Sequence, residues 1–274
     1  MILSLVIILI AILAPLVSPY DPYESSLVEA YQGPSAVHRF GTDTLGRDIF
    51  SRVIFGTRIS VSSSLILVSL SLLIGSFFGL IAGYFGGTVD AVIMRICDMM
   101  IAFPDLILAI AIAGILGASL INGIIAILVV SWTKYARLAR SMVLKIKNRD
   151  YISAARTTGS KDGHIISWYM IPNALPTLVI TAATDIGTMM LSLASLSFLG
   201  FGVRPPAPEW GYMLSEGRLY IQTYPWMMIY PGLAIFVTVV VFNLLGDSIR
   251  DILDPKDKKK RRKKKKRKQG GNAL

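Results

Sequence analysis

Residues 59–84 read ISVSSSLILVSLSLLIGSFFGLIAGY, without one charged side chain. A second uncharged run covers Trp226–Gly246. The hydrocarbon core of a bilayer is roughly 30 Å thick and takes about 20 helical residues, so both runs are long enough to cross it. In lipid the backbone must satisfy its own hydrogen bonds, so each run is expected to be a helix. The sequence therefore predicts membrane spans.

Apolar runs at six places predict an all-α, polytopic membrane protein with about six transmembrane helices. The predicted spans are 1–18, 59–84, 92–117, 120–140, 170–200 and 226–247. The first run could be a signal peptide, but no Lys or Arg precedes Arg39 and Ser18-Pro19 is a poor cleavage context. We therefore expect a retained first transmembrane helix.

The same pattern divides the chain into four parts. These are the first helix 1–18, an extracytoplasmic loop 19–58, a five-helix core 59–247 with a cytoplasmic loop at 145–165, and a tail 248–274. In the outer loop, Leu45, Ile49, Phe50, Val53 and Ile54 recur at helical spacing between Thr44 and Thr57. That spacing predicts a short amphipathic helix lying on the membrane or on a partner.

The net charge of +11 is unevenly distributed. Residues 250–274 hold 13 Lys/Arg and 3 Asp/Glu, and segment 134–161 holds another eight Lys/Arg. Because cytoplasmic loops carry the excess of Lys/Arg, we expect both termini and segment 134–161 to be cytoplasmic. The basic run after about residue 256 is expected to be disordered and to contact anionic lipid. It lacks aromatic residues for base stacking, so we expect no nucleic-acid binding.

Catalytic and metal-binding machinery is not predicted from this sequence. It has no Gly-x-x-x-x-Gly-Lys-Ser/Thr motif for phosphate binding. His38 and His164 fall on opposite sides of the membrane in the predicted topology and cannot share a metal ion. The single cysteine, Cys97, excludes an internal disulfide and is expected to be buried. If the protein performs energised work, another chain must supply the ATPase.

The cytoplasmic loop between the fourth and fifth spans is the most informative segment. Ala154 and Ala155 offer a small, flat surface that another protein could approach closely. Gly159 permits the left-handed turn that ends a helix, and Ser160 can cap the next one. Two short helices at a sharp angle are therefore predicted, of a kind that fits a groove on a partner. The alternative is an ordinary basic loop that sets topology.

A family resemblance supports the docking interpretation. The pattern Ala154-Ala155…Gly159…Ile171-Pro172 resembles the coupling motif of bacterial ABC importer permeases, although Ser153 stands where the family usually has Glu. The resemblance implies that this loop docks into a cleft of a cytoplasmic ATPase. The implied coupling residues are Tyr151, Ser153, Ala154, Ala155, Arg156, Gly159, Ile171 and Pro172.

Five further motifs, in the family's order, resemble the dipeptide/oligopeptide/nickel branch and the second permease of its heteromeric pair. They lie at 40–52, 95–104, 196–202, 205–211 and 245–255. The resemblance implies a bacterial or archaeal inner-membrane subunit that moves peptides, nickel or metal chelates inward. The implied partners are a homologous permease, two ATPase subunits that use ATP and Mg, and an extracytoplasmic substrate-binding protein. No cofactor is expected on this chain itself.

The first of these motifs is implied to lie at the outer mouth, as a gate or a partner contact. Its candidate residues are Gly41, Thr42, Asp43, Gly46, Arg47 and Asp48. The alternative is a solvated interfacial helix without a role in transport.

Polar residues inside the predicted spans need a reason, because a charge at a helix centre costs at least about 2.5 kcal/mol. Asp105, Asp185 and Met189 are candidates for the translocation path. Asp185 is expected to line the pore or to bond a neighbouring helix, and not to face lipid. Methionines in spans, such as Met189, are more often flexible core residues than ligand contacts. Gly75, Gly79 and Gly83 predict close helix packing, within the subunit or between permeases.

Two other classes of function stay open at this point. A secondary transporter would show inverted repeats, and no convincing internal repeat is present. A membrane-embedded assembly factor with a lipid-binding tail is the other alternative.

Overall fold

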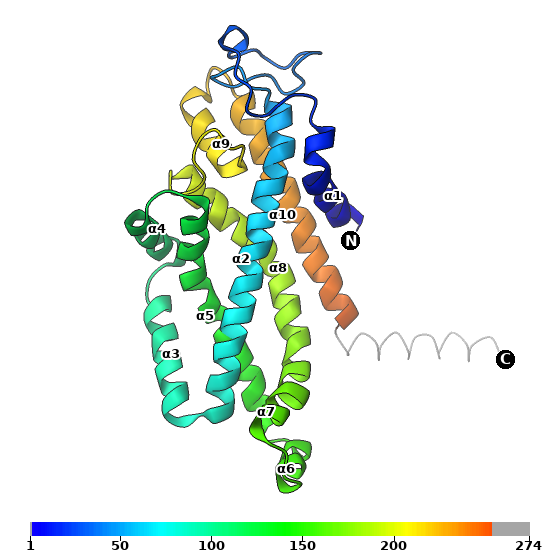
Figure 1. Ribbon diagram of the computed structural model, residues 1–274, viewed down its shortest axis with the longest axis vertical. Coiled ribbons are helices and arrows are strands. Elements are labelled where there is room, and N and C mark those ends of the chain that lie inside the picture. The colour runs from blue at the N-terminus through cyan, green and yellow to red at the C-terminus, as the bar shows by residue number, and fades with distance from the viewer. Residues whose placement is uncertain (1, 254–274) are drawn as a thin grey trace, which may run out of the picture.

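The computed structural model describes residues 2–253 and shows a long bundle of helices (Figure 1). Its main helices are α1 (Ile2–Val17), α2 (Ile49–Phe85), α3 (Gly87–Ile101), α4 (Asp105–Leu116), α5 (Leu120–Lys147), α6 (Asp150–Thr157), α7 (Asp162–Ile165), α8 (Ile171–Phe198), α9 (Trp210–Gly217) and α10 (Trp226–Leu253). The predicted basic tail after about residue 256 lies outside the described residues.

The number of apolar helices agrees with the prediction of about six spans. Among the described residues, four helical stretches are long and apolar enough to cross a membrane: Ile49–Phe85, Leu120–Lys147, Asp162–Phe198 and Trp226–Ile252. The pair α3 and α4 passes the same test together, and α1 is a shorter apolar helix. The chain is therefore an all-α, multi-pass membrane protein.

The two ends of the bundle carry different structures. Helices α6 and α7 form one end, which we call the α6 end (Figure 1). Helix α9 and the segment between α1 and α2 form the other, the α9 end (Figure 1). The segment and α9 are therefore close neighbours in space although most of the helical bundle separates them in the sequence.

Close packing of α2 on α5 forms the centre of the bundle. A Cβ atom on Gly75 would lie 2.3 Å from the carbonyl oxygen of Trp132, and one on Gly79 would lie 2.2 Å from that of Ala136. On Gly83 it would lie 2.8 Å from the Cβ of Val143. The three glycines thus allow two backbones of the same subunit to approach, which is the first of the two predicted alternatives.

The outer amphipathic helix is not a separate element. Asp48 caps α2 by accepting a hydrogen bond of 2.7 Å from the Ser51 N–H, and the helix then runs without a break to Phe85. The prediction of a short helix over Thr44–Thr57 is therefore wrong in its bounds. Charged residues within 49–58 do not end the helix, because Arg52 is buried and paired, as described below.

The third predicted span, 92–117, is broken. Helices α3 and α4 meet at an angle of 91°, and Pro104 stands between them. Pro104 is the N-cap of α4; it has no N–H to donate to the preceding turn and disfavours the helical conformation at Phe103, which fits a break at this point. Asp98 of α3 pairs with Arg137 of α5.

Candidate functional site

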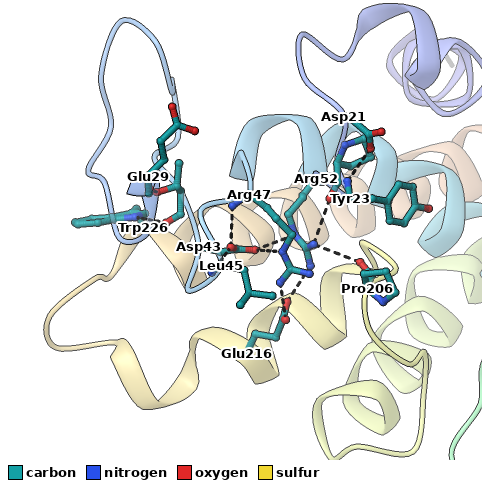
Figure 2. Close-up of polar contacts among 12 residues, drawn as sticks. Asp21, Tyr23, Glu29, Asp43, Leu45, Arg47, Arg52, Pro206, Glu216 and Trp226 are labelled. Atoms are coloured by element: carbon teal, nitrogen blue, oxygen red, sulfur yellow. Dashed lines mark hydrogen bonds and ion pairs between the residues drawn. The ribbon is translucent and has the colours of Figure 1, made fainter. Parts of the chain in front are cut away.

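A cluster of buried charges fastens the α9 end. Arg47 donates from Nε to Asp43 Oδ2 at 2.6 Å and from Nη2 to Glu216 Oε1 at 2.8 Å. Arg52 donates from Nη2 to the other oxygen of Glu216, also at 2.8 Å. Figure 2 shows these four side chains converging from the 18–48 segment, α2 and α9. We call Asp43, Arg47, Arg52 and Glu216 the charge cluster.

The charge cluster is electrostatically balanced, with two cations and two anions. Burial by itself lowers the pKa of Arg47, but the carboxylates of Asp43 and Glu216 outweigh that effect and hold its pKa above the ordinary value. Arg47 therefore stays charged although it is 1% exposed. Arg52 also donates to the carbonyl oxygens of Pro22 and Pro206, at 3.4 and 3.3 Å (Figure 2). The cluster thus ties three distant segments together.

The backbone around the charge cluster is held equally tightly. Gly46 has φ +73°, and a Cβ there would lie 1.8 Å from the carbonyl oxygen of Ser26. Thr42 donates to the Glu29 carbonyl oxygen at 2.5 Å. The Nδ1 atom of His38 lies 2.9 Å from Oδ1 of Asp48. These contacts fix the 18–48 segment on the start of α2.

The structure therefore brings the six outer candidates into one packed junction. Gly41, Thr42, Asp43, Gly46, Arg47 and Asp48 are all buried. Their side chains are not available to a partner in this arrangement, and a role in gating stays a prediction. Sequence reasoning missed Glu216, because it lies 164 residues from Arg52 and no local pattern marks it.

The three translocation-path candidates line one cavity. Asp105, Asp185 and Met189 contribute to a cavity of about 500 Å³ enclosed by the end of α3 and by α4, α5 and α8. Its other polar lining residues are Ser131, Thr133, Lys134, Arg137, Thr188 and Ser192. A role of this cavity in transport stays a prediction, but the residues chosen for it lie together.

Asp185 meets the expectation of a bond to a neighbouring helix, and its role in lining a pore stays a prediction. It lines the cavity, and it bonds a neighbouring helix: Lys134 Nζ of α5 lies 2.7 Å from Oδ1, and the Tyr135 hydroxyl donates to Oδ2 at 2.9 Å. Asp185 is only 6% exposed. Sequence reasoning counted Lys134 among the cytoplasmic charges that set orientation; in the structure it also pairs with Asp185, while its own side chain stays more than half exposed.

The predicted coupling loop forms α6 and α7, as expected, but the two alanines differ. Ile152 and Ala155 are buried and face the bundle, where Ile152 packs in a cluster with Tyr84, Val143 and Ile165. Ala154 is exposed. The expectation that Ala154 and Ala155 form one docking surface is therefore wrong for Ala155, because helical periodicity turns its side chain inward.

The remaining coupling candidates lie on the surface of the α6 end. Tyr151, Ser153, Arg156, Gly159, Ile171 and Pro172 are all exposed. Gly159 has φ +82°, which confirms the left-handed turn. The expected cap from Ser160 is wrong: Lys161 precedes α7, without a side-chain capping bond.

Contacts between α6, α7 and α2 fix the loop to the bundle. The Tyr84 hydroxyl of α2 donates to Asp162 Oδ1 at 2.5 Å, and the Arg156 guanidinium lies 5.5 Å from the centre of the Tyr84 ring. A force applied to α6 would therefore reach α2 directly.

Comparison with solved structures identifies the fold. The chain resembles the inward-facing MetNI methionine ABC transporter, with a TM-score of 0.56 and 22% identity, over 75% of this chain and 98% of the other. The fold is therefore that of an ABC importer permease.

Residues 75–259 match the family model "Binding-protein-dependent transport system inner membrane component", and the chain belongs to that family. Residues 1–34 match the N-terminal transmembrane domain of oligopeptide transport permease C. The resemblance found in the sequence is therefore confirmed.

Curated relatives agree along nearly the whole chain. The dipeptide transport system permease DppC of Alkalihalophilus pseudofirmus is 45% identical over 92% of this chain and 83% of its own length. The probable D,D-dipeptide permease DdpC of Escherichia coli K12 is 42% identical over 93% and 86%. The glutathione permease GsiD of Escherichia coli O6:K15:H31 is 44% identical over 93% and 84%.

Proposed function

We propose that this chain is one of two homologous permeases in an importer that moves short peptides inward. The support is the agreement of three relatives named for dipeptides, D,D-dipeptides and glutathione. A cavity of about 500 Å³ also falls in the range that proteins use for small ligands. None of these three relatives is named for nickel, so peptides are preferred over nickel or metal chelates.

The proposed complex contains four further subunits. A second permease completes the path, two cytoplasmic ATPases bind ATP and Mg, and an extracytoplasmic binding protein delivers the peptide. This chain binds no cofactor of its own. The α6 end faces the cytoplasm in a bacterial or archaeal inner membrane, both termini are cytoplasmic, and the basic tail, which lies outside the described residues, contacts anionic lipid.

The observation that carries the docking proposal is the two-sided character of α6. One side is anchored to the bundle through Ile152 and Ala155, and the other exposes Tyr151, Ser153 and Ala154. A short helix that is rigidly anchored and exposed on its other face suits a groove on a partner. Nucleotide-driven closure of the ATPases would then bias the arrangement of the spans, as a ligand that prefers one of two states does.

The test is peptide uptake by the reconstituted complex carrying Ala154→Glu. Burying an unpaired charge in the ATPase groove is expected to lower ATP-dependent uptake about tenfold or more, while insertion into the membrane is retained. Thr88→Glu is the matched control, because Thr88 is also exposed and lies in the first turn of α3 at the same end of the bundle. Wild-type uptake by Ala154→Glu would reject the docking assignment.

The same assay separates the alternative classes. A secondary transporter would take up peptide without ATP, and an assembly factor would show no uptake in either condition.

A further inference from the structure

The ion pair between Lys134 and Asp185 is unequal in its exposure. The Asp185 side chain is 8% exposed, whereas that of Lys134 is 55% exposed. Both residues line the cavity between α4, α5 and α8. One partner is thus fixed inside the bundle, and the other is a long, flexible side chain that can change its position without disturbing the packing.

Asp185 keeps a second bond if Lys134 moves. The Tyr135 hydroxyl, on a fully buried side chain, donates to the other carboxylate oxygen at 2.9 Å. A buried carboxylate still needs a cation close by, because an uncompensated buried charge is strongly unfavourable. Asp185 would therefore accept another ammonium group in place of the Lys134 ammonium, but loss of the Lys134 ammonium without a replacement cation would be strongly unfavourable.

The cavity also offers the opposite charge once such an exchange occurs. Arg137, the other cation of the lining, is already paired with Asp98. After an exchange Lys134 would lose Asp185 as its ion-pair partner. Asp105, the other carboxylate of the lining, is exposed on α4 and is not paired with Lys134, so a carboxylate on the same ligand would satisfy the lysine. A ligand with an ammonium alone would pair with Asp185 and leave Lys134 unpaired, whereas a ligand that carries both an ammonium and a carboxylate leaves both protein charges paired.

We propose that Lys134 and Asp185 form a binding site inside the bundle for the two charged ends of a short zwitterionic peptide, with the peptide ammonium on Asp185 and its carboxylate on Lys134. This proposal rests on the proposed function as a peptide permease and adds the groups that select the cargo. The competing explanation is a purely structural pair that joins α5 to α8 and never meets a ligand.

The experiment measures equilibrium binding of three radiolabelled probes to the purified complex of permeases and ATPases without the binding protein. The probes are Ala-Ala, N-acetyl-Ala-Ala, which lacks the ammonium, and Ala-Ala-amide, which lacks the carboxylate. Omitting the binding protein leaves only the discrimination made by the membrane subunits. The variants are Asp185→Asn and Lys134→Gln. Asp90→Asn is the control, since Asp90 pairs with Arg140 between α3 and α5 and does not line the cavity.

We expect the wild type to prefer Ala-Ala over each blocked peptide by about tenfold, the factor that one charged hydrogen bond provides. Asp185→Asn should lose the preference against the N-acetylated probe alone, and Lys134→Gln should lose the preference against the amide alone. Lys134→Arg should restore the second preference. Asp90→Asn should behave as the wild type.

Two results would overturn the proposal. One is a Lys134→Gln variant that still prefers Ala-Ala over Ala-Ala-amide as the wild type does. This variant alters a half-exposed side chain and is expected to fold even if Asp185→Asn does not. The other is equal loss at both ends in either variant, which fits a structural pair. Peptide uptake by the wild-type complex with its binding protein is measured in parallel. Normal uptake with unchanged discrimination rejects this inference alone, whereas absence of uptake rejects the proposed function and this inference together.

Discussion

Glu216 contacts both arginines of the charge cluster, one through each of its two carboxylate oxygens. Each oxygen accepts a bond from a different guanidinium, and Arg47 and Arg52 are almost completely buried. Without Glu216, Asp43 would be the only carboxylate of the cluster left for two buried cations. The stability of the α9 end therefore depends on a residue outside the 18–48 segment.

Glu216→Gln is expected to lower the free energy of unfolding by about 3 kcal/mol or more, because it removes the charge that compensates two buried cations. SDS titration of the purified protein in mild detergent measures this. Glu24→Gln is the control, since Glu24 is exposed. Equal stability of the two variants would mean that the charge cluster contributes little.

Alanine substitutions at Gly46 and Gly87 separate the cost of a left-handed backbone from the cost of a steric clash. Both have a positive φ, +73° and +55°. A Cβ on Gly46 would lie 1.8 Å from a backbone oxygen, whereas nothing lies within 4 Å of one on Gly87. Gly87→Ala should cost about 1 kcal/mol through the left-handed backbone alone. Gly46→Ala should cost distinctly more in the same unfolding assay. Similar losses in the two variants would show that the 18–48 segment can shift to make room.

Distance along the chain decides which residues of the candidate site were predictable. Asp185 stands out in the sequence because it is a charge in an apolar run, and the structure places it in a cavity. Its partner Lys134 lies 51 residues away, and Glu216 lies 164 residues from Arg52. No local pattern relates such pairs, since only the packing of α5 on α8, or of α9 on α2, brings them together.

At the scale of elements, the contact between α2 and α5 depends on small residues. Gly79→Ala places a methyl group 2.2 Å from the Ala136 carbonyl oxygen, so the two helices must separate. We expect a loss of about 1–3 kcal/mol in the free energy of unfolding, as for other overpacked sites. Gly114→Ala in α4 is the control, because its nearest neighbour, the Phe201 ring, would lie at 3.7 Å. A neutral Gly79→Ala variant would contradict the close packing.

The elements themselves were largely predictable, and their ends were not. Uncharged runs revealed the long helices, because lipid leaves the backbone no alternative. The sequence predicted two separate helices, over 44–57 and 59–84, because the uncharged run begins only after Arg58, and the pairing that neutralises Arg52 within one continuous α2 is not local. The break at Pro104 had a visible signal in the proline itself. The inward side of α6 could have been inferred from the spacing of Ile152 and Ala155.

At the scale of the whole molecule, orientation can be tested through single cysteines in a Cys97→Ala background, since the native thiol is buried. Val28→Cys places a thiol on the α9 end at a position that is 94% exposed, and Thr88→Cys places one at an exposed position in the first turn of α3, outside the proposed docking face. A membrane-impermeant maleimide added to intact cells should label only Val28→Cys. Thr88→Cys should react after the cells are permeabilised. The reverse pattern would invert the proposed topology.

Helix α2 connects the charge cluster at the α9 end with the contacts to α6 and α7 at the other end. It is 37 residues long, about 55 Å, contains no proline, and carries Arg52 of the charge cluster near one end and Tyr84, which contacts α6 and α7, near the other. If a helix of this length tilts by about 5° about one of its ends, its other end moves by about 5 Å. If an ATPase displaces α6 as proposed, α2 would carry that displacement toward the opposite end of the bundle. The displacement would then strain the ion pairs of Arg52 or be absorbed by bending of α2.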